Sequence, residues 1–293
     1  MEHVPVMPHE VTKYLNIQTN GVYIDCTFGG GGHSKSILSM LSPNGRLISI
    51  DWDKETIRDN GPKFSDYENF TLICGNFADL SNIVEKLKIV KIDGILFDLG
   101  FSSGQIGDRK RGFSFLGEAP LDMRYNEDNP LTAQILLNNY PQDYLEDILK
   151  NYAQERFFKS IANGIIKYRK EKKIETTREL VEIIKRTTPG WYHHRRIHLA
   201  TKTFQALRMA VNGEIKNIEN GIKSAINLIS SGGRIAVISF HSMEHRCVKN
   251  IFREAKQNNL VIPVVKKSVI PSESEMIANP RSRSSQLRIV EKV

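Results

Sequence analysis

A glycine-rich stretch, Asp25-Cys26-Thr27-Phe28-Gly29-Gly30-Gly31-Gly32-His33-Ser34, decides the fold of this chain. The apolar run Val22–Phe28 predicts a buried strand, and His33–Leu41 has the apolar spacing of a helix. In an open α/β sheet, the loop that joins a strand to the next helix lies at the carboxyl edge, where such folds bind ligands. Because glycines let the backbone approach a ligand closely, we expect a ligand site at this loop.

Strand and helix patterns alternate through the first hundred residues, which favours a parallel sheet covered by helices on both faces. We predict an α/β fold, a doubly wound Rossmann-like domain whose last strands complete the sheet. Besides the first, the expected strands are Arg46–Ile50, Phe70–Cys74, Ile92–Leu99, Arg234–Phe240, Val261–Val265 and Leu287–Val290.

The pattern changes to helices near residue 106. Most segments from there to about residue 206 have helical spacing, and Thr176 with Glu179 forms a capping-box pattern. The segment Ala200–Ile229 fits one long helix or two short ones. We therefore expect two domains, a core of residues 1–105 and 207–293 and an all-helical insertion of residues 106–206.

Composition and charge narrow the class of protein. The chain has 293 residues, 40% of them hydrophobic, and a formal net charge of +8, which fits a polyanionic partner or simply a basic surface. Its three cysteines form no C-x-x-C pair, so we expect neither a disulfide framework nor a thiolate zinc site. The first residues lack a signal-peptide pattern and no apolar run could span a bilayer, so we expect a cytoplasmic protein without a membrane partner.

The glycine loop discriminates between three kinds of cofactor. A dinucleotide site would continue as G-x-G-x-x-G and a nucleotide triphosphate site as a P-loop, but Ser34 stands where both need a glycine. S-adenosylmethionine carries no phosphate and needs neither glycine. Asp51, after the second expected strand, is placed to accept hydrogen bonds from ribose hydroxyls. The methyl donor fits best, and a purely structural glycine turn stays open.

Asp98 ends the fourth expected strand, where a glycine and two serines follow it. In a doubly wound sheet this strand lies beside the first, so its end faces the same crevice. Asp is also common as a turn or helix cap, which is the structural alternative. Because several expected strands have acidic, glycine-rich ends, we favour a ligand-binding role for Asp98 over a capping role.

Motifs along nearly the whole chain are similar to those of the bacterial ribosomal RNA small-subunit methyltransferase H family, also called MraW. The motifs are Thr27–Ser34, Asp98–Ser103, Arg111–Phe115, Pro120–Arg124, Glu155–Phe157, Thr203–Arg208, Ile238–Ser242 and Asn279–Ser284. The resemblance implies an S-adenosylmethionine-dependent methyltransferase fold with a helical insertion, and N4-methylation of a cytidine in the decoding region of 16S rRNA. The chain departs from the family pattern at Gly30, Gly104, Leu199 and His245.

The resemblance also implies which residues contact the cofactor, with the Phe77 ring placed to stack on adenine. These residues are Gly31, Gly32, His33, Asp51, Phe77, Asp98 and Gln105, and the loop pattern adds Gly29.

The implied reaction needs a group that holds the target base. An exocyclic amine of cytosine is a poor nucleophile because its lone pair is delocalised, so an acceptor for its protons would assist the transfer. The candidates are Asp98, Asp122, His241 and Ser242. Methylation at carbon 5 would instead need a cysteine nucleophile, and none of the three cysteines lies at the end of the fourth strand.

Basic residues gather in the insertion and near the C-terminus. Trp191 and Tyr192 lie beside Arg195 and Arg196, a combination that favours phosphate contacts and stacking on RNA, although one such cluster alone is more often a solvated face. We expect the insertion to recognise RNA. The predicted RNA contacts are Arg111, Arg124, Arg195, Arg196, Arg208, Arg281 and Arg283.

A metal site is the remaining chemical alternative. The H-x-x-E-H pattern of His241–His245 would have to lie within one helix, but His241 directly follows a strand. We therefore expect no metal. A non-catalytic RNA-binding factor, a zinc hydrolase and a DNA cytosine-N4 methyltransferase are the competing hypotheses. The expected partner is 16S rRNA or the small ribosomal subunit, and a homodimer stays open.

Overall fold

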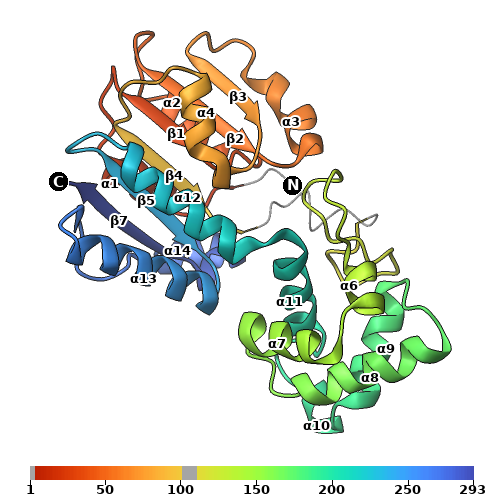
Figure 1. Ribbon diagram of the computed structural model, residues 1–293. Coiled ribbons are helices and arrows are strands. Elements are labelled where there is room, and N and C mark those ends of the chain that lie inside the picture. The colour runs from red at the N-terminus through yellow and green to blue at the C-terminus, as the bar shows by residue number, and fades with distance from the viewer. Residues whose placement is uncertain (1–3, 101–110) are drawn as a thin grey trace. The chain divides into compact units, whose positions relative to one another are not determined.

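The chain folds into two compact units, Met1–Ser102 with Ile215–Val293, and Ser103–Glu214 (Figure 1). The structure is a computed structural model, and it describes residues 4–100 and 111–293. The predicted second boundary, after residue 206, falls inside helix α11 (Thr201–Asn212), which belongs to the second unit.

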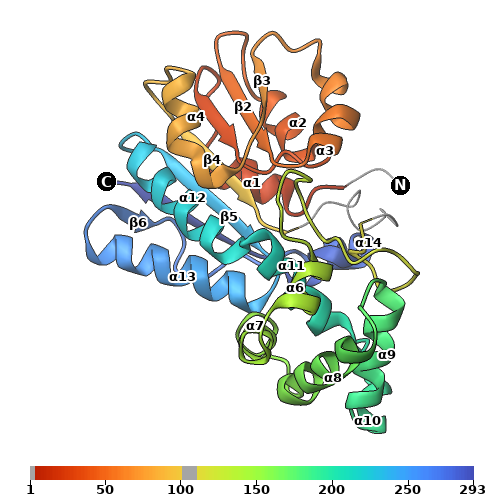
Figure 2. The same ribbon diagram turned by 45° about the vertical axis from the view of Figure 1, so that its right-hand side comes forward.

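The first unit is built on a sheet that has the strand order β3-β2-β1-β4-β5-β7-β6 among its described residues (Figures 1 and 2). Strands β1 to β5 are parallel, and β7 is antiparallel to both of its neighbours. This arrangement confirms the predicted doubly wound α/β fold. The strands are β1 (Val22–Asp25), β2 (Arg46–Asp51), β3 (Phe70–Cys74), β4 (Gly94–Asp98), β5 (Arg234–Ser239), β6 (Val261–Pro263) and β7 (Gln286–Lys292).

Strand β1 is shorter than the sequence predicts. It ends at Asp25 instead of Phe28 because the Asp25 carboxylate accepts a hydrogen bond from the Thr27 N–H, which turns the backbone. The remaining strands lie where they were expected, with ends shifted by a few residues. The glycine loop therefore begins at the carboxyl edge of the sheet.

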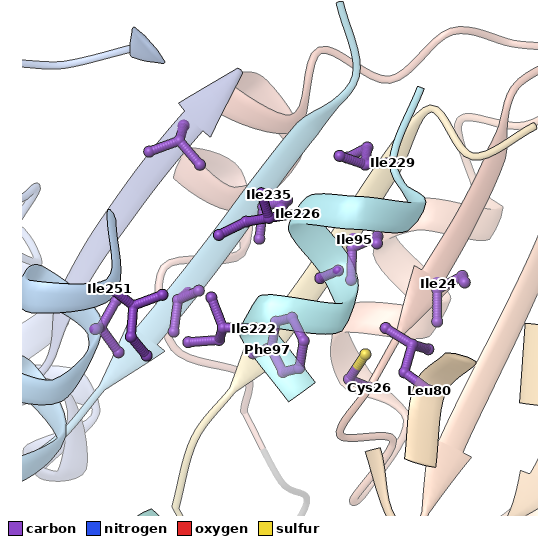
Figure 3. Packing of buried hydrophobic residues seen from close by; sticks show 14 of the residues in the cluster. Ile24, Cys26, Leu80, Ile95, Phe97, Ile222, Ile226, Ile229, Ile235 and Ile251 are labelled. Carbon is purple, nitrogen blue, oxygen red and sulfur yellow. The ribbon is translucent and has the colours of Figure 1, made fainter. Parts of the chain in front are cut away.

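Helices cover both faces of the sheet, and the side chains of each strand alternate between them. Ile95 and Phe97 point toward α4 (Leu80–Lys86), α12 (Glu214–Leu228) and α13 (Ser242–Gln257) (Figure 3). Leu96 points toward the opposite face. That face is covered by α1 (Pro8–Leu15) and α2 (Gly32–Leu38), while α3 (Lys54–Asn60), α14 (Glu273–Ala278) and the short 3₁₀ helices Gly61–Phe64, Phe77–Asp79 and Pro280–Ser284 complete the unit.

The second unit is helical and has its own apolar core. The predicted capping box is confirmed, because Thr176 accepts from the Glu179 N–H and the Glu179 carboxylate accepts from the Thr176 N–H. Gly213, with φ of +59°, ends α11, so Ala200–Ile229 forms two helices. The helices before α11 are α6 (Ala133–Asn139), α7 (Gln142–Ala153), α8 (Phe158–Glu171), α9 (Thr177–Thr187) and α10 (Gly190–His193). Among the described residues, no helix has both the length and the apolar character needed to cross a membrane.

Replacing Gly112 tests the loop that begins the described part of the helical unit. Gly112 has φ of +68°, and a Cβ there would collide with the carbonyl oxygen of Pro120. We expect Gly112→Ala to lower the free energy of unfolding by about 2–4 kcal/mol, through backbone strain and displacement of the Pro120 segment.

The matched control is Gly117→Ala, since a Cβ at Gly117 has no neighbour within 4 Å. Urea unfolding followed by circular dichroism compares the two variants. Equal losses of stability in both would contradict this account of Gly112.

Candidate active site

The buried carboxylate of Asp25 joins the end of β1 to the start of α2 and to β2. Its Oδ1 accepts a hydrogen bond from the Thr27 N–H at 3.1 Å, and its Oδ2 accepts one from the Ser34 hydroxyl at 2.7 Å. The Ser34 hydroxyl in turn lies 2.8 Å from that of Ser49 on β2. Both ends of the glycine loop are thus fixed to the sheet.

Asp51, the last residue of β2, is bonded to the same loop. Its Oδ2 accepts from the Gly29 N–H and its Oδ1 from the Asp53 N–H, each at 2.8 Å. Burial raises the pKa of Asp51 to about 6 in spite of these two hydrogen bonds. Each carboxylate oxygen has a further lone pair, so Asp51 can still accept hydrogen bonds from hydroxyl groups of a ligand.

The partly buried Asp98 and the buried His33 form a pair at the end of β4. The Asp98 N–H donates to Thr27 Oγ1 at 2.7 Å, and Asp98 Oδ2 lies 3.4 Å from His33 Nε2. Burial by itself would lower the pKa of His33, but the carboxylates of Asp98, Asp25 and Glu275, Asp98 foremost, together outweigh burial and raise that pKa. Asp98 Oδ1 and His33 Nδ1 are buried and have no hydrogen-bond partner among the described residues, while His33 Nε2 faces Asp98 Oδ2. Such atoms are rare in folded proteins, and they are available to a ligand here.

Two glycines of the loop are required by their surroundings. Gly31 has φ of +77°, and a Cβ there would lie 2.5 Å from the Phe64 ring. A Cβ on Gly32 would lie 2.9 Å from the Pro5 ring. A side chain at either position would therefore push these rings apart, so the loop keeps its backbone close to its neighbours.

Phe77 lies beyond the end of β3 and is partly buried. Its ring packs edge-on against Phe97, with 5.5 Å between the ring centroids, and a Cβ on Gly221 of α12 would lie 2.6 Å from it. The ring is held by packing, and its stacking on adenine stays a prediction. Gln105, the other predicted contact beyond β4, lies outside the described residues.

The three carboxylates define which ligand suits this loop. Asp25, Asp51 and Asp98 follow or end the strands around it, and like charges would repel a phosphate placed among them. A ligand with ribose hydroxyls and a positive charge would instead be stabilised by the same groups. The residues present therefore fit S-adenosylmethionine and disfavour the dinucleotide and triphosphate alternatives.

His241 and Ser242 follow β5, the neighbour of β4 in the sheet. His241 caps α13, since its Nδ1 accepts from the Glu244 N–H at 3.4 Å, and its Nε2 lies 3.1 Å from Glu244 Oε1. Glu244 Oε2 accepts from the Phe240 N–H at 2.7 Å. The H-x-x-E-H pattern thus forms a capping box at a strand–helix junction, and Ser242 is exposed in the first turn.

Asp122 lies in the second unit and is bonded to Arg124. Its Oδ1 accepts from Arg124 Nε at 2.9 Å and its Oδ2 from Nη2 at 2.7 Å. Burial would raise the pKa of Asp122, but these hydrogen bonds lower it. Arg124 also donates to the carbonyls of Glu127 and Asn129. The Asp122–Arg124 pair therefore stabilises the loop in which it lies. The contact of Asp122 with the target base and that of Arg124 with RNA stay predictions.

The arginines that were predicted to contact RNA differ in exposure. Arg111 and Arg208 are each 7% exposed, and Arg208 forms a bidentate ion pair with Glu214 at 2.7 and 2.9 Å. Their burial favours a structural role over a phosphate contact. The exposed members of the set are Arg195, Arg196, Arg281 and Arg283.

None of the cysteines has the surroundings of a nucleophile at the end of β4. Cys26 is 1% exposed, and burial raises its pKa. Burial raises the pKa of Cys247 to about 12. Cys74 is exposed at the end of β3. The structure thus agrees with setting aside methylation at carbon 5.

Sequence reasoning missed Thr27 and Ser34 as members of the site. The signal was present for Thr27, because an Asp followed two residues later by Thr is a common turn in which side chain and backbone bond. No local signal identifies the bond between the Asp98 N–H and Thr27 Oγ1, which joins residues 71 positions apart.

Comparison with known proteins confirms the resemblance seen in the motifs. The MraW methylase family matches residues 1–293. Ribosomal RNA small subunit methyltransferase H of Clostridium botulinum strain 657 / Type Ba4 is 42% identical over 307 aligned residues, which cover 100% of this chain and 99% of the relative. The protein of the same name from Clostridium botulinum strain Kyoto / Type A2 is also 42% identical, with the same coverage.

A solved structure, a candidate rRNA-methylase from Clostridium thermocellum, supports the fold. It matches with a TM-score of 0.50 at 12% identity, covering 99% of this chain and 100% of that chain. The chain therefore belongs to the MraW methylase family and is an S-adenosylmethionine-dependent methyltransferase.

Proposed function

We propose that this protein methylates the N4 amine of a cytidine in the decoding region of 16S rRNA. Full-length relatives at 42% identity are named for the small-subunit ribosomal RNA. The observation within the structure that carries the proposal is the partly buried Asp98 carboxylate, whose buried Oδ1 has no partner among the described residues. The exocyclic amine of cytosine is a weak nucleophile, so a group at the end of β4 that accepts its proton would assist the transfer.

The cofactor would be held by groups from three strand ends. Asp51 would accept the ribose hydroxyls, while Gly29, Gly31 and Gly32 let the loop backbone approach. His33 and Asp98 supply unpaired polar atoms within the same unit. When bound, S-adenosylmethionine supplies an electrophilic methyl group on a positively charged sulfur.

The chemical work of the chain is to position the amine and to accept its protons. As nitrogen bonds to the methyl carbon, the bond from that carbon to sulfur breaks and leaves its electron pair on sulfur. Positive charge meanwhile develops on nitrogen, and a nearby carboxylate stabilises that charge. Asp98 can then accept one proton of the methylated amine at Oδ1, because its other oxygen, Oδ2, faces His33 Nε2 at 3.4 Å. His241 and Ser242 follow the adjacent strand and remain proposed contacts to the base, as does Asp122 of the helical unit.

Cofactor affinity should fall as the pH is lowered through the pKa of Asp51. Because that pKa is raised to about 6, the ionised acceptor exists only above this pH and is lost below it. We expect the Kd for S-adenosylmethionine to rise by about tenfold for each pH unit below that value. Calorimetric titration between about pH 5 and about pH 8 measures this dependence.

Asp51→Asn is the control, because its amide does not titrate while His33 still does. The variant should bind more weakly and lose the part of the pH dependence that Asp51 contributes. An unchanged pH slope in Asp51→Asn would assign the titration to another group.

Asp98→Asn should slow methyl transfer by about 100-fold or more at saturating cofactor, because the amide cannot take a proton from the amine. Asp59→Asn serves as the control, since Asp59 is an exposed carboxylate of α3 paired with Arg58. Single-turnover transfer to small ribosomal subunits measures both rates. A near wild-type rate for Asp98→Asn would remove this residue from the chemical step.

The proposed function itself is tested on small subunits from cells that lack this gene. The purified protein is incubated with labelled S-adenosylmethionine, and the modified nucleoside is identified by mass spectrometry. We expect N4-methylcytidine within the decoding region. Transfer to another position or nucleoside, or no transfer at all, would contradict the proposal.

A further inference from the structure

One corner of the helical unit presents an exposed tryptophan. Trp191 belongs to α10, which lies at an extremity of this unit beside α8 (Figures 1 and 2). It meets Arg156 and Phe157, which directly precede α8. We call Arg156, Phe157, Trp191 and Tyr192 the aromatic corner.

Trp191 stays 54% exposed although three side chains support it. Its ring centroid lies 5.8 Å from that of Phe157 and 5.9 Å from that of Tyr192, in tilted and edge-on contacts. The Arg156 guanidinium carbon lies 5.5 Å from the indole centroid. An indole this exposed leaves part of its π surface open to a partner.

Buried polar groups hold the corner in place. Tyr192 is 3% exposed, and its hydroxyl donates to Glu155 Oε2 at 2.7 Å. Glu155 is 2% exposed, and its Oε1 accepts from the Phe157 N–H at 2.9 Å. Because both carboxylate oxygens are bonded, the supporting rings are fixed before any ligand arrives. A rigid aromatic surface loses little entropy on binding.

The charge around the corner selects the class of partner. Residues 185–202 contain five Lys or Arg and three His residues but no Asp or Glu. Arg195 also lies over the ring of Tyr192, with 5.0 Å between its guanidinium carbon and the ring centroid. Among the described residues, neither Arg156 nor Arg196 forms an ion pair with a carboxylate. A polyanion with flat aromatic groups fits this combination.

We propose that the aromatic corner is a stacking site for an unpaired base of the RNA substrate, with Trp191 as the platform and the neighbouring arginines as phosphate contacts. This inference rests on the proposed function and adds a second place where the helical unit contacts RNA bases. Stacking tolerates any base, because each base has a π face. The corner therefore contributes affinity rather than choice of the methylated nucleotide.

The fluorescence of Trp191 tests base stacking directly. The chain has two tryptophans, so Trp52→Phe leaves Trp191 as the single reporter. A ten-residue oligouridylate is titrated into this full-length variant, with an abasic sugar-phosphate chain of the same length as the control. We expect saturable quenching by the oligouridylate and none by the abasic chain. Equal effects of the two probes, or no quenching by either, would overturn the inference.

Substitution of Trp191 tests the contribution to the substrate complex. Trp191→Ala should raise the KM for deproteinised 16S rRNA and for small subunits by about tenfold, the size expected for one lost stack, and leave single-turnover transfer at saturating substrate unchanged. Trp191→Phe should recover most of the affinity. The control is Tyr144→Ala, which removes a ring of α7 that is 37% exposed.

The outcomes separate this inference from the proposed function. If Trp191→Ala methylates with wild-type KM, the stacking site is wrong and the proposed reaction stands. If its KM rises only with assembled subunits and not with deproteinised rRNA, the corner contacts a ribosomal protein, which also overturns the inference. If the wild-type protein methylates neither substrate, the proposed function fails, while quenching still reports on the corner.

Discussion

The hydrogen bonds of the buried Asp25 carboxylate are the constraint on which the site depends. Asp25 holds the Thr27 N–H and the Ser34 hydroxyl, so the glycine loop must begin and end at fixed points of the sheet. Thr27 connects the loop to β4, because its hydroxyl oxygen accepts a hydrogen bond from the Asp98 N–H. The buried Asp25 thus fixes the position of the glycine loop. It also fixes the position of Asp98, the carboxylate that we propose as the acceptor of the amine proton.

The same packing determines the charge of the site. Burial raises the pKa of both Asp25 and Asp51, so ionised carboxylates are unfavourable there until a ligand compensates them. His33 offsets part of the negative charge of Asp98, since its Nε2 lies 3.4 Å from Asp98 Oδ2. A ligand that brings hydroxyl donors and positive charge relieves this cost, whereas a phosphate adds to it. The preference for a phosphate-free cofactor is therefore electrostatic, in addition to the absence of a motif glycine at Ser34.

Much of the fold follows from local sequence, but the site follows only in part. Strand β4 was predictable because its apolar run ends at an aspartate, and the Thr176 capping box has a local signature. The contact of His33 with Asp98 depends on the register of β1 and β4, which no local pattern encodes. Arg208 was predicted as an RNA contact because sequence cannot distinguish an exposed arginine from one buried against Glu214. Gly213, the residue that ends α11, was the available signal for the second domain boundary.

A crystal structure of the protein with S-adenosylhomocysteine tests the central claim most directly, because it locates the ligand relative to Asp51 and Asp98. The account predicts ribose hydroxyls within hydrogen-bond distance of the Asp51 carboxylate and a partner for the buried Asp98 Oδ1. A ligand bound away from the glycine loop, with the surroundings of both carboxylates unchanged, would contradict it.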